Sequence, residues 1–433
     1  MSERTVRMEV PLLARVEGEG ALDLSIVDGR IEDLRLRIFE PPRLFEKLLE
    51  GRSYAEVPDI VARICGICPV AYQMSAVHAI ESAFGVEVTP WVRAMRRLMY
   101  CGEWIESHAL HIHLLAAPDF FGYDSAIEMA QGYPDEVRRG LRLQALGNEI
   151  IRLLGARSVH PVGVRVGGFH RAPAPEAVRE LAGRLQAALP DARELVRWTA
   201  RFPLPQAQQR FRCVALRHPS EYPMNAGRIV SDNAADLDIG AGEFETRFTE
   251  TPVPHSTALH AHLDGQPYLV GPLARINLGG ARLPREVDET LAGTGVHFPS
   301  WNMFHSVVAR AVEIHYAILE ALRLLREYVA PDTPFIAVTP RAGEAAWATE
   351  APRGLLWHRY AIGDDGRIRS ARIVPPTSQN QARIEQDLRE SMQRFGADRD
   401  DAQLRRHAEI IIRNYDPCIS CATHFLRLDV TRR

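Results

Sequence analysis

Four cysteines in two pairs are the residues of this chain whose types and spacing most clearly suggest chemistry. Cys65 and Cys68 lie in "RICGICPVAYQM", and Cys418 and Cys421 lie in "DPCISCATH". In each pair the chain can turn between the cysteines, so that both thiolates reach one metal ion. A helix-like run follows the first pair, and the N–H groups at the start of a helix lower the pKa of nearby thiols. The two pairs therefore predict a site with four sulfur ligands.

Three kinds of site use four thiolates. A structural zinc is the usual explanation for two such motifs, an iron–sulfur cluster needs the same ligands, and a thiolate-bound nickel or dinuclear centre also suits soft donors. Zinc ribbons hold their pairs about 15–20 residues apart, whereas almost the whole chain separates Cys68 from Cys418. A chain of 433 residues can bury its own core without zinc. Spacing leaves the three alternatives open but favours a deep, functional centre.

Composition narrows the class of protein. The net charge is −3, with 46% hydrophobic and 25% charged residues, which is ordinary for a globular protein and argues against nucleic acid or an anionic membrane as the main partner. Six cysteines are too few for a disulfide scaffold. The sequence contains no run of apolar residues long enough to span a membrane, and "MSERTVRMEV" lacks the apolar stretch of a signal peptide. These features predict a cytoplasmic protein without a transmembrane segment.

The periodicity of hydrophobic residues predicts the elements that must position the cysteines. Residues 21–39 alternate around Asp28-Gly29, which predicts a β-hairpin. Helical spacing recurs along much of the remaining chain, and 303–329 is the strongest helical run. The other expected helices are 43–64 and 73–84 in short pieces, 90–116, 135–156, 175–200 and 381–395. A short strand pair is expected within 353–376, followed after the last helix by an apolar approach to Cys418.

These patterns predict a mainly α fold with a small β portion (α+β). We expect a core of long helices, an N-terminal β-hairpin or sheet, and a metal site that joins the N- and C-terminal segments. We treat 1–433 as one domain. Its expected parts are a β-hairpin region (1–40), a helical region (41–200), an irregular or β insert (201–300), a helical and C-terminal metal segment (301–424) and a possible cleavable tail (425–433).

The sequence around the cysteines resembles the large subunits of nickel–iron hydrogenases. "RICGIC" and "DPCISCATH" are similar to the two signature motifs of that family. Further similar motifs follow in the same order: "RVEGEG" at 15–20, "FEKLLEGR" at 45–52, "HPVGVRVGG" at 160–168, "YLVGPLAR" at 268–275, "EAPRGLL" at 350–356 and "IVPPTSQNQ" at 373–381. The resemblance covers essentially the whole chain. The chain's length and "CGICPVAYQMSAVH" are similar to the cytoplasmic, NAD(P)-linked and sulfhydrogenase-type group.

The resemblance implies the catalytic subunit of an enzyme that splits H2 reversibly. Cys65 and Cys418 would be terminal nickel ligands, and Cys68 and Cys421 would bridge nickel and iron. In the family the iron carries CO and cyanide. The resemblance also implies partners: an iron–sulfur small subunit takes the electrons, and flavin- and NAD(P)-binding diaphorase subunits pass them on. This chain has no Gly-rich dinucleotide motif of its own.

Four further residues acquire roles by the same resemblance. Glu17 would relay the proton from Cys418, although a lone glutamate at this place is also explained by pairing with Arg15. Arg353 would place its guanidinium over the open metal position. Asp119 and Asp416 would be the acidic partners that hold Arg353 in place.

Two groups of residues would surround the centre. Pro376 and Thr377 match a Pro-Ser/Thr pair that contacts a cyanide. Glu46, the carbonyl of Ile373 and His424 match a site for magnesium or another hard divalent cation, for which carboxylate and carbonyl oxygens are suitable ligands.

Other features of the sequence are explained without a metal or bear on maturation. The closely spaced His108, His111 and His113 are interpreted as second-layer or helix-packing residues. Tyr72 and Glu19 stand where many family members have histidine. The segment 425–433 is predicted to be removed by a maturation endopeptidase. The alternatives to a hydrogenase are a non-catalytic zinc- or iron–sulfur-stabilised subunit and a hydrogen-sensing homologue.

Overall fold

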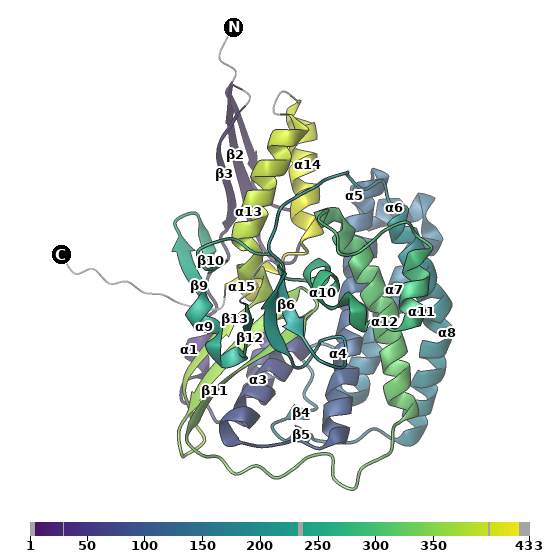
Figure 1. Ribbon diagram of the computed structural model, residues 1–433, viewed down its shortest axis with the longest axis vertical. Coiled ribbons are helices and arrows are strands. Elements are labelled where there is room, and N and C mark those ends of the chain that lie inside the picture. Colours follow the sequence, from purple (N-terminus) through teal and green to yellow (C-terminus); the bar gives the residue numbers. More distant parts are fainter. Residues whose placement is uncertain (1–4, 29, 233–236, 397–398, 424–433) are drawn as a thin grey trace, which may run out of the picture.

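The computed structural model describes residues 5–28, 30–232, 237–396 and 399–423. Long helices form one side of the molecule, and small antiparallel sheets form the other (Figure 1). This arrangement confirms the predicted mainly α architecture with a small β portion. None of the helices in these ranges is both long and apolar enough to cross a membrane.

Four long helices build the bundle in Figure 1, and α4 packs against α7 and α12 while α12 packs against α8. Their bounds are α4, Pro90–Leu110; α7, Pro134–Gly155; α8, Pro175–Ala200; and α12, Ser306–Arg326. Three of the four begin with proline, whose fixed φ suits the first helical position. The predicted run 90–116 ends in a π-helix, His111–Ala116, just before Pro118. Proline cannot donate the next helical hydrogen bond, so the regular helix is interrupted there.

An antiparallel sheet occupies the N-terminal end of the chain. Strands β2 (Gly20–Val27) and β3 (Arg30–Ile38) form the predicted hairpin, and β1 (Thr5–Val10) pairs with β2. Two helices pack near it, α13 (Pro376–Phe395) and α14 (Asp401–Asn414). The sequence predicted most of α13 but not α14. Asp400 accepts a hydrogen bond from the N–H of Gln403 and so caps α14, and this signal is not part of the apolar pattern.

The segment 201–300, predicted as irregular with some β structure, contains several short elements. Strands β6, β7 and β8 form one antiparallel sheet, and β9 and β10 form a hairpin. Their bounds are β6, Val214–Arg217; β7, Arg228–Ser231; β8, Asp238–Ile239; β9, Phe248–Val253; and β10, Ser256–Leu263, followed by α10, Pro272–Gly279, and α11, Arg285–Ala292.

A third sheet carries the helix that follows the first cysteine pair. Strands β11 (Gly343–Ala351), β12 (Gly354–Ile362) and β13 (Ile368–Val374) are antiparallel, and α3 (Pro69–Phe84) packs on β11 and β12. The strand pair expected at 353–376 is therefore confirmed, with β11 as a third strand. The remaining short elements are α1, Phe45–Leu49; α2, Val57–Val61; α5, Ala117–Phe121; α6, Ala126–Gly132; β4, Val164–Arg165; β5, Gly168–Phe169; α9, Phe244–Arg247; and α15, Ile419–Ala422.

The two ends of the described chain meet at one place. Glu17 and Cys418 form an isolated parallel β-bridge, in which the N–H of Ile419 donates to the carbonyl of Glu17 at 3.0 Å. Close by, the N–H of Arg43 donates to the carbonyl of Thr423. These bonds bring the segment that carries the second cysteine pair against the N-terminal segment, as the sequence predicted.

Candidate metal centre

The four paired cysteines converge on one buried point. Their sulfur atoms all lie within 4.8 Å of one another. The Sγ–Sγ distances are 2.9 Å between Cys418 and Cys421, 3.4 Å between Cys65 and Cys418, and 3.7 Å between Cys68 and Cys421. None of them is in a disulfide bond. Four thiols at such distances form a ligand set for soft metals.

Backbone hydrogen bonds fix the first cysteine pair. The sulfur of Cys65 accepts the N–H groups of Ile67 and Cys68, both at 3.3 Å. Immediately afterwards α3 begins with Pro69, and the carboxylate of Glu103 on α4 accepts the N–H groups of Val70 at 2.6 Å and Ala71 at 3.0 Å. Glu103 thus caps the helix from a neighbouring helix and ties the cysteine turn to the bundle.

The second pair is fixed by α13. The N–H of Cys418 donates to Oγ1 of Thr377 at 3.0 Å, next to Pro376, which begins this helix. The predicted residues Pro376 and Thr377 are therefore both buried beside the C-terminal cysteines.

Electrostatics favour a cation among the sulfurs. Hydrogen bonds from Cys418 and the other thiols lower the pKa of Cys65 well below its usual value. In contrast, burial raises the pKa of Cys418 well above its usual value, because the neighbouring thiols also disfavour a further negative charge. Four thiolates cannot coexist here without positive charge, and metal ions supply it.

Glu17 touches the sulfur cluster. The thiol of Cys418 donates to Oε2 of Glu17 at 3.1 Å, and the N–H of Ser420 donates to the same oxygen at 3.0 Å. The alternative explanation from sequence was an ion pair with Arg15, but the guanidinium of Arg15 pairs with Asp119 instead. The structure therefore places the carboxylate of Glu17 in hydrogen-bond contact with Cys418 and not with Arg15.

Arg353 is buried beside the cysteines, in the turn between β11 and β12. Its Nε donates to the carbonyl of Asp416 at 2.9 Å, and its Nη2 donates to the carboxylate of Asp416 at 3.1 Å. The remaining nitrogen, Nη1, is buried without a hydrogen-bond partner among the described residues. A buried, unpartnered donor is costly, so its presence fits a group that binds at this point.

Asp119 lies elsewhere than the sequence analysis predicted. Its carboxylate accepts from Nε and Nη2 of Arg413 at 2.8 and 2.9 Å, and it also pairs with Arg15. Two other arginines bind Asp119. Arg413 on α14 and Arg15 near the N-terminal sheet both reach the short helix α5 that carries Asp119, whereas Asp416 follows α14 directly and turns back towards Arg353. Asp416 alone of the two predicted aspartates pairs with Arg353.

The predicted hard-cation site is only partly within the described residues. Glu46 accepts the N–H of Ile373 at 2.7 Å, so the carboxylate lies beside the residue whose carbonyl was expected to be a ligand. Burial raises the pKa of Glu46 to about 7. His424, the third expected ligand, and the predicted tail 425–433 lie outside the described residues.

The three histidines near the π-helix are structural, as expected. Nε2 of His108 lies 2.9 Å from the carboxylate of Glu313, and Nε2 of His111 lies 2.8 Å from the carbonyl of Arg413. Nδ1 of His113 lies 3.0 Å from the carbonyl of Ala109. Tyr72, one of the departures from the family pattern, is fully buried on α3 and packs against the ring of His358.

Two buried glutamates near the centre escaped the sequence analysis. Glu103 and Glu106 both lie on α4, and burial raises the pKa of each carboxyl well above its usual value, with Cys65 and Arg353 among the charges that each one faces. Both lie in a sequence with ordinary helical spacing. The sequence signal for buried carboxyls was the presence of two acidic residues within a largely apolar run.

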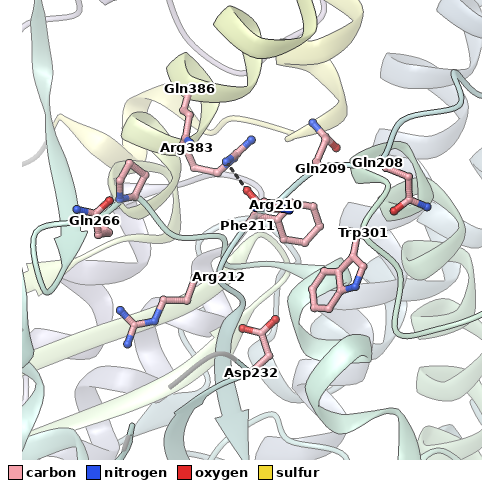
Figure 2. Close-up of a pocket in the computed structure, with 11 residues that line it drawn as sticks. Gln208, Gln209, Arg210, Phe211, Arg212, Asp232, Gln266, Trp301, Arg383 and Gln386 are labelled. Atoms are coloured by element: carbon pink, nitrogen blue, oxygen red, sulfur yellow. Dashed lines mark hydrogen bonds between the residues drawn. The ribbon is translucent and has the colours of Figure 1, made fainter. Parts of the chain in front are cut away.

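A separate cavity of about 680 Å³ opens between α13 and the segment 208–212. Figure 2 shows Arg210, Arg212 and Arg383 around it, together with the rings of Phe211 and Trp301. None of its lining residues is a cysteine of the cluster or a predicted site residue. The candidate centre therefore rests on the buried sulfurs and not on this cavity.

Comparisons with known proteins agree with this geometry. The family model "Nickel-dependent hydrogenase" matches residues 43–137 and 242–424, two segments that include both cysteine pairs. Sulfhydrogenase 2 subunit alpha of Pyrococcus furiosus is 34% identical over 97% of this chain and 100% of its own length. The chain belongs to the nickel-dependent hydrogenase family.

Other family members extend the comparison. The HoxS subunit beta of the NAD-reducing hydrogenase of Cupriavidus necator is 26% identical over 97% of this chain and 95% of its own length. A solved structure of an NAD+-reducing [NiFe]-hydrogenase in the H2-reduced state superimposes with a TM-score of 0.86, at 27% identity, over 97% of this chain and 99% of that one. The four sulfurs and the unpartnered Nη1 of Arg353 fit the nickel–iron centre that membership of this family implies.

Proposed function

We propose that this chain is the catalytic subunit of a [NiFe] hydrogenase, which converts H2 reversibly into two protons and two electrons. The observation that carries the proposal is the convergence of four buried sulfurs, two from each end of the chain, within 4.8 Å. Family membership and the similarity to the alpha subunit of a sulfhydrogenase support it.

The cysteines would hold the metals in two roles. Cys65 and Cys418 would be terminal ligands of nickel, and Cys68 and Cys421 would bridge nickel and iron. When bound, the metal pair supplies polarisation of H2 and uptake of its electrons. Soft thiolate donors suit this redox chemistry. CO and cyanide on the iron are part of the proposal, and burial of the cluster supports it, because small neutral and anionic ligands would be shielded from water there.

The chain itself would move the proton. Cys418 already donates a hydrogen bond to Oε2 of Glu17, so a proton on Sγ needs to cross only this 3.1 Å contact to reach the carboxylate. The N–H of Ser420 holds that oxygen in place. In the reverse direction Glu17 would return the proton to the same sulfur.

Arg353 would polarise H2 from above the metals. Asp416 fixes the guanidinium through two of its nitrogens and leaves Nη1 free for the reacting molecule or for a cyanide. The charge is thus oriented before substrate arrives, which is the condition for effective electrostatic stabilisation. Asp416 is a positioning residue in this scheme, and Pro376 and Thr377 would contact the second cyanide.

A magnesium ion or another hard divalent cation would bind Glu46, the carbonyl of Ile373 and His424. The contact between Glu46 and the backbone of Ile373 supports the first two ligands. A bound cation would also compensate the buried carboxylate. Glu46→Gln should then lower the magnesium content of the purified protein while nickel and iron stay unchanged.

The electrons would leave through other subunits. The four clustered cysteines are committed to one centre, and Cys101 and Cys213 are the other two cysteines of the chain, too few for a relay of iron–sulfur clusters. We therefore propose an iron–sulfur small subunit as partner. The similarity to a subunit of an NAD-reducing hydrogenase supports flavin- and NAD(P)-binding diaphorase subunits beyond it.

Two further proposals concern the location of the chain in the cell and its maturation. All six cysteines are free thiols, as is typical of a reducing compartment, which supports the cytoplasm. Removal of 425–433 by a maturation endopeptidase stays a prediction. Comparing the mass of the purified subunit with that of the full 433-residue chain tests it.

The other functions considered from the sequence are not favoured. A zinc- or iron–sulfur-stabilised binding subunit would need neither Glu17 against a sulfur nor a free nitrogen on a buried arginine. A hydrogen-sensing homologue would share the centre, and a slow turnover rate would identify it.

One experiment on the purified complex tests the proposal. Metal analysis should give nickel and iron near one each per chain, and H2 should reduce a redox dye. Cys418→Ser should abolish dye reduction, whereas Cys101→Ser, which removes a buried thiol outside the cluster, should retain it. Zinc as the only metal, or full activity in Cys418→Ser, would overturn the assignment.

A further inference from the structure

A second cluster of metal-ligating side chains lies outside the cysteine centre. A ligand atom of each of His255, His260 and Glu385 falls within 4.8 Å of the other two. His255 lies in the turn of the β9–β10 hairpin, His260 lies on β10, and Glu385 lies on α13, which packs against β10. Figure 1 shows the hairpin beside the lower half of α13. The cluster therefore joins two elements that lie far apart in the sequence.

The side chain of His260 indicates that this cluster binds an ion. It is 4% exposed, and its Nε2 is buried without a hydrogen-bond partner among the described residues. A buried polar atom of this kind needs an explanation, because nearly all such atoms in proteins are paired. The rings of His255 and His260 face each other edge to face, with centroids 5.8 Å apart, so one ion can reach both.

The carboxylate of Glu385 is already oriented. Its Oε1 accepts the N–H of Leu36 on β3 at 2.9 Å and lies 2.8 Å from Nε2 of His255. A backbone hydrogen bond that fixes a ligating carboxylate is a typical outer contact of metal sites. Ligands of a tetrahedral zinc lie roughly 3.3 Å apart, so His255 and Glu385 would separate by only a small movement.

We propose that His255, His260 and Glu385 bind one divalent transition-metal ion, with zinc(II) the best fit. Two imidazoles and one carboxylate favour zinc over magnesium or calcium, which prefer oxygen ligands. The side chains of His255 and Glu385 are 18% and 19% exposed, so an ion can enter and water can complete its coordination. No electron or proton transfer is part of this site.

The ion would act as a structural clip on α13. This helix begins at Pro376 and Thr377, where Thr377 accepts the N–H of Cys418, and it continues to Glu385. Thr257, between the two histidines, donates to the carbonyls of Ile38 and Glu40 and ties the same hairpin to the end of β3. A metal at the cluster would hold helix, hairpin and sheet together. The inference does not depend on the identity of the metals at the cysteines.

The test uses the full chain in its purified complex, with zinc itself as the probe. After removal of loosely bound ions with a chelator, the wild type should bind one more equivalent of zinc per chain than His260→Gln or Glu385→Gln. The matched control is His262→Gln, two residues along β10 and outside the cluster, which should bind as the wild type does. Zinc should raise the Tm of the wild type and of His262→Gln but not that of the two cluster variants.

Cobalt(II) distinguishes this cluster from the cysteines. Bound here, it should give visible d–d bands without the near-ultraviolet thiolate-to-metal charge-transfer bands, and these visible bands should disappear in Glu385→Gln. Should His260→Gln fail to fold, His255→Asn provides an independent variant at the exposed side of the cluster. Equal zinc content in the wild type and all folded cluster variants, or equal loss in His262→Gln, would overturn the proposal.

Discussion

The carboxylate of Glu17 and the sulfur of Cys418 are in hydrogen-bond contact at 3.1 Å, although 401 positions separate them in the sequence. The contact belongs to a parallel β-bridge between the same two residues, so the backbone as well as the side chains holds it. Closing so large a loop costs conformational entropy, and the N–H of Ser420, which donates to the same carboxylate, helps to fix the arrangement.

The first prediction concerns proton transfer at this contact. Glu17→Gln keeps an acceptor for the N–H of Ser420 but cannot take a proton from Cys418, so H2-dependent dye reduction should fall by about 10²–10⁴-fold. Exchange between D2 and solvent protons should slow in parallel, while nickel and iron contents stay at the wild-type level. Glu19→Gln is the matched control, because Glu19 is exposed and should be nearly silent. Full activity in Glu17→Gln would exclude the relay.

The second prediction concerns the free nitrogen of Arg353. Lysine keeps the positive charge, but all its donors lie on one nitrogen, so it cannot bind Asp416 as Nε and Nη2 do and also present a donor at the place of Nη1. Arg353→Lys should therefore lower dye reduction by about 10²–10³-fold without loss of metal. On the neighbouring strand β12, Arg359 pairs with Glu245 and Glu344 away from the sulfurs, so Arg359→Lys should leave the rate within a factor of two of wild type. Similar losses in both variants would contradict a special role for Arg353.

The third prediction separates Asp119 from Asp416. Asp119→Asn removes the buried charge that Arg413 and Arg15 share, which should cost about 3–5 kcal/mol and lower the Tm of the chain. Because Arg353 is held by Asp416, the infrared bands of the proposed CO and cyanide ligands and the activity of intact centres should persist. Asp135→Asn, which loses an exposed pair with Arg138, should leave the Tm unchanged. A shift of the infrared bands in Asp119→Asn would restore the role first predicted for it.

The fourth prediction concerns acid stability. Burial lowers the pKa of His113 to about 4, against 6.5 for a free histidine. Between these two pH values His113 is protonated in the unfolded chain but neutral in the folded chain. The free energy of unfolding therefore falls as the pH drops from 6.5 towards 4. His108 and His111, whose pKa values burial lowers to about 4 and about 3, act in the same direction.

His113→Gln should therefore flatten the decline of the Tm between pH 6.5 and pH 4. Each histidine contributes a slope of about 1.4 kcal/mol per pH unit within its own range. Thermal unfolding of the complex across this range measures the effect, and His297→Gln, at an exposed position, should keep the wild-type slope. An unchanged slope in His113→Gln would show that His113 is charged in the native state.

Local patterns predicted much of the fold because each pattern reports on its own segment. The long helices α7 and α8 were predicted to within one residue at each end. Apolar residues at helical spacing can be recognised within one segment, whatever that segment packs against. Helix α14 and strand β1 were missed. The first depends on a capping aspartate, and the second becomes a strand only by pairing with β2.

The candidate metal centre also has features that the sequence predicted and features that depend on tertiary contacts. The residue types and the resemblance were enough to select Cys65, Cys68, Cys418 and Cys421, because thiolates in pairs have few other uses. Which acid pairs with Arg353 was decided only by the tertiary structure, where α14 ends next to the turn between β11 and β12 and so brings Asp416, not Asp119, within reach. The sequence carries no sign of Glu103 as a helix cap or of His260 beside Glu385, because these contacts join elements far apart along the chain. The type of a side chain determines which metals it can bind, so the sequence alone indicates the ligand chemistry. Distance and desolvation, which decide what the ligands do, arise only when the core brings both ends of the chain together.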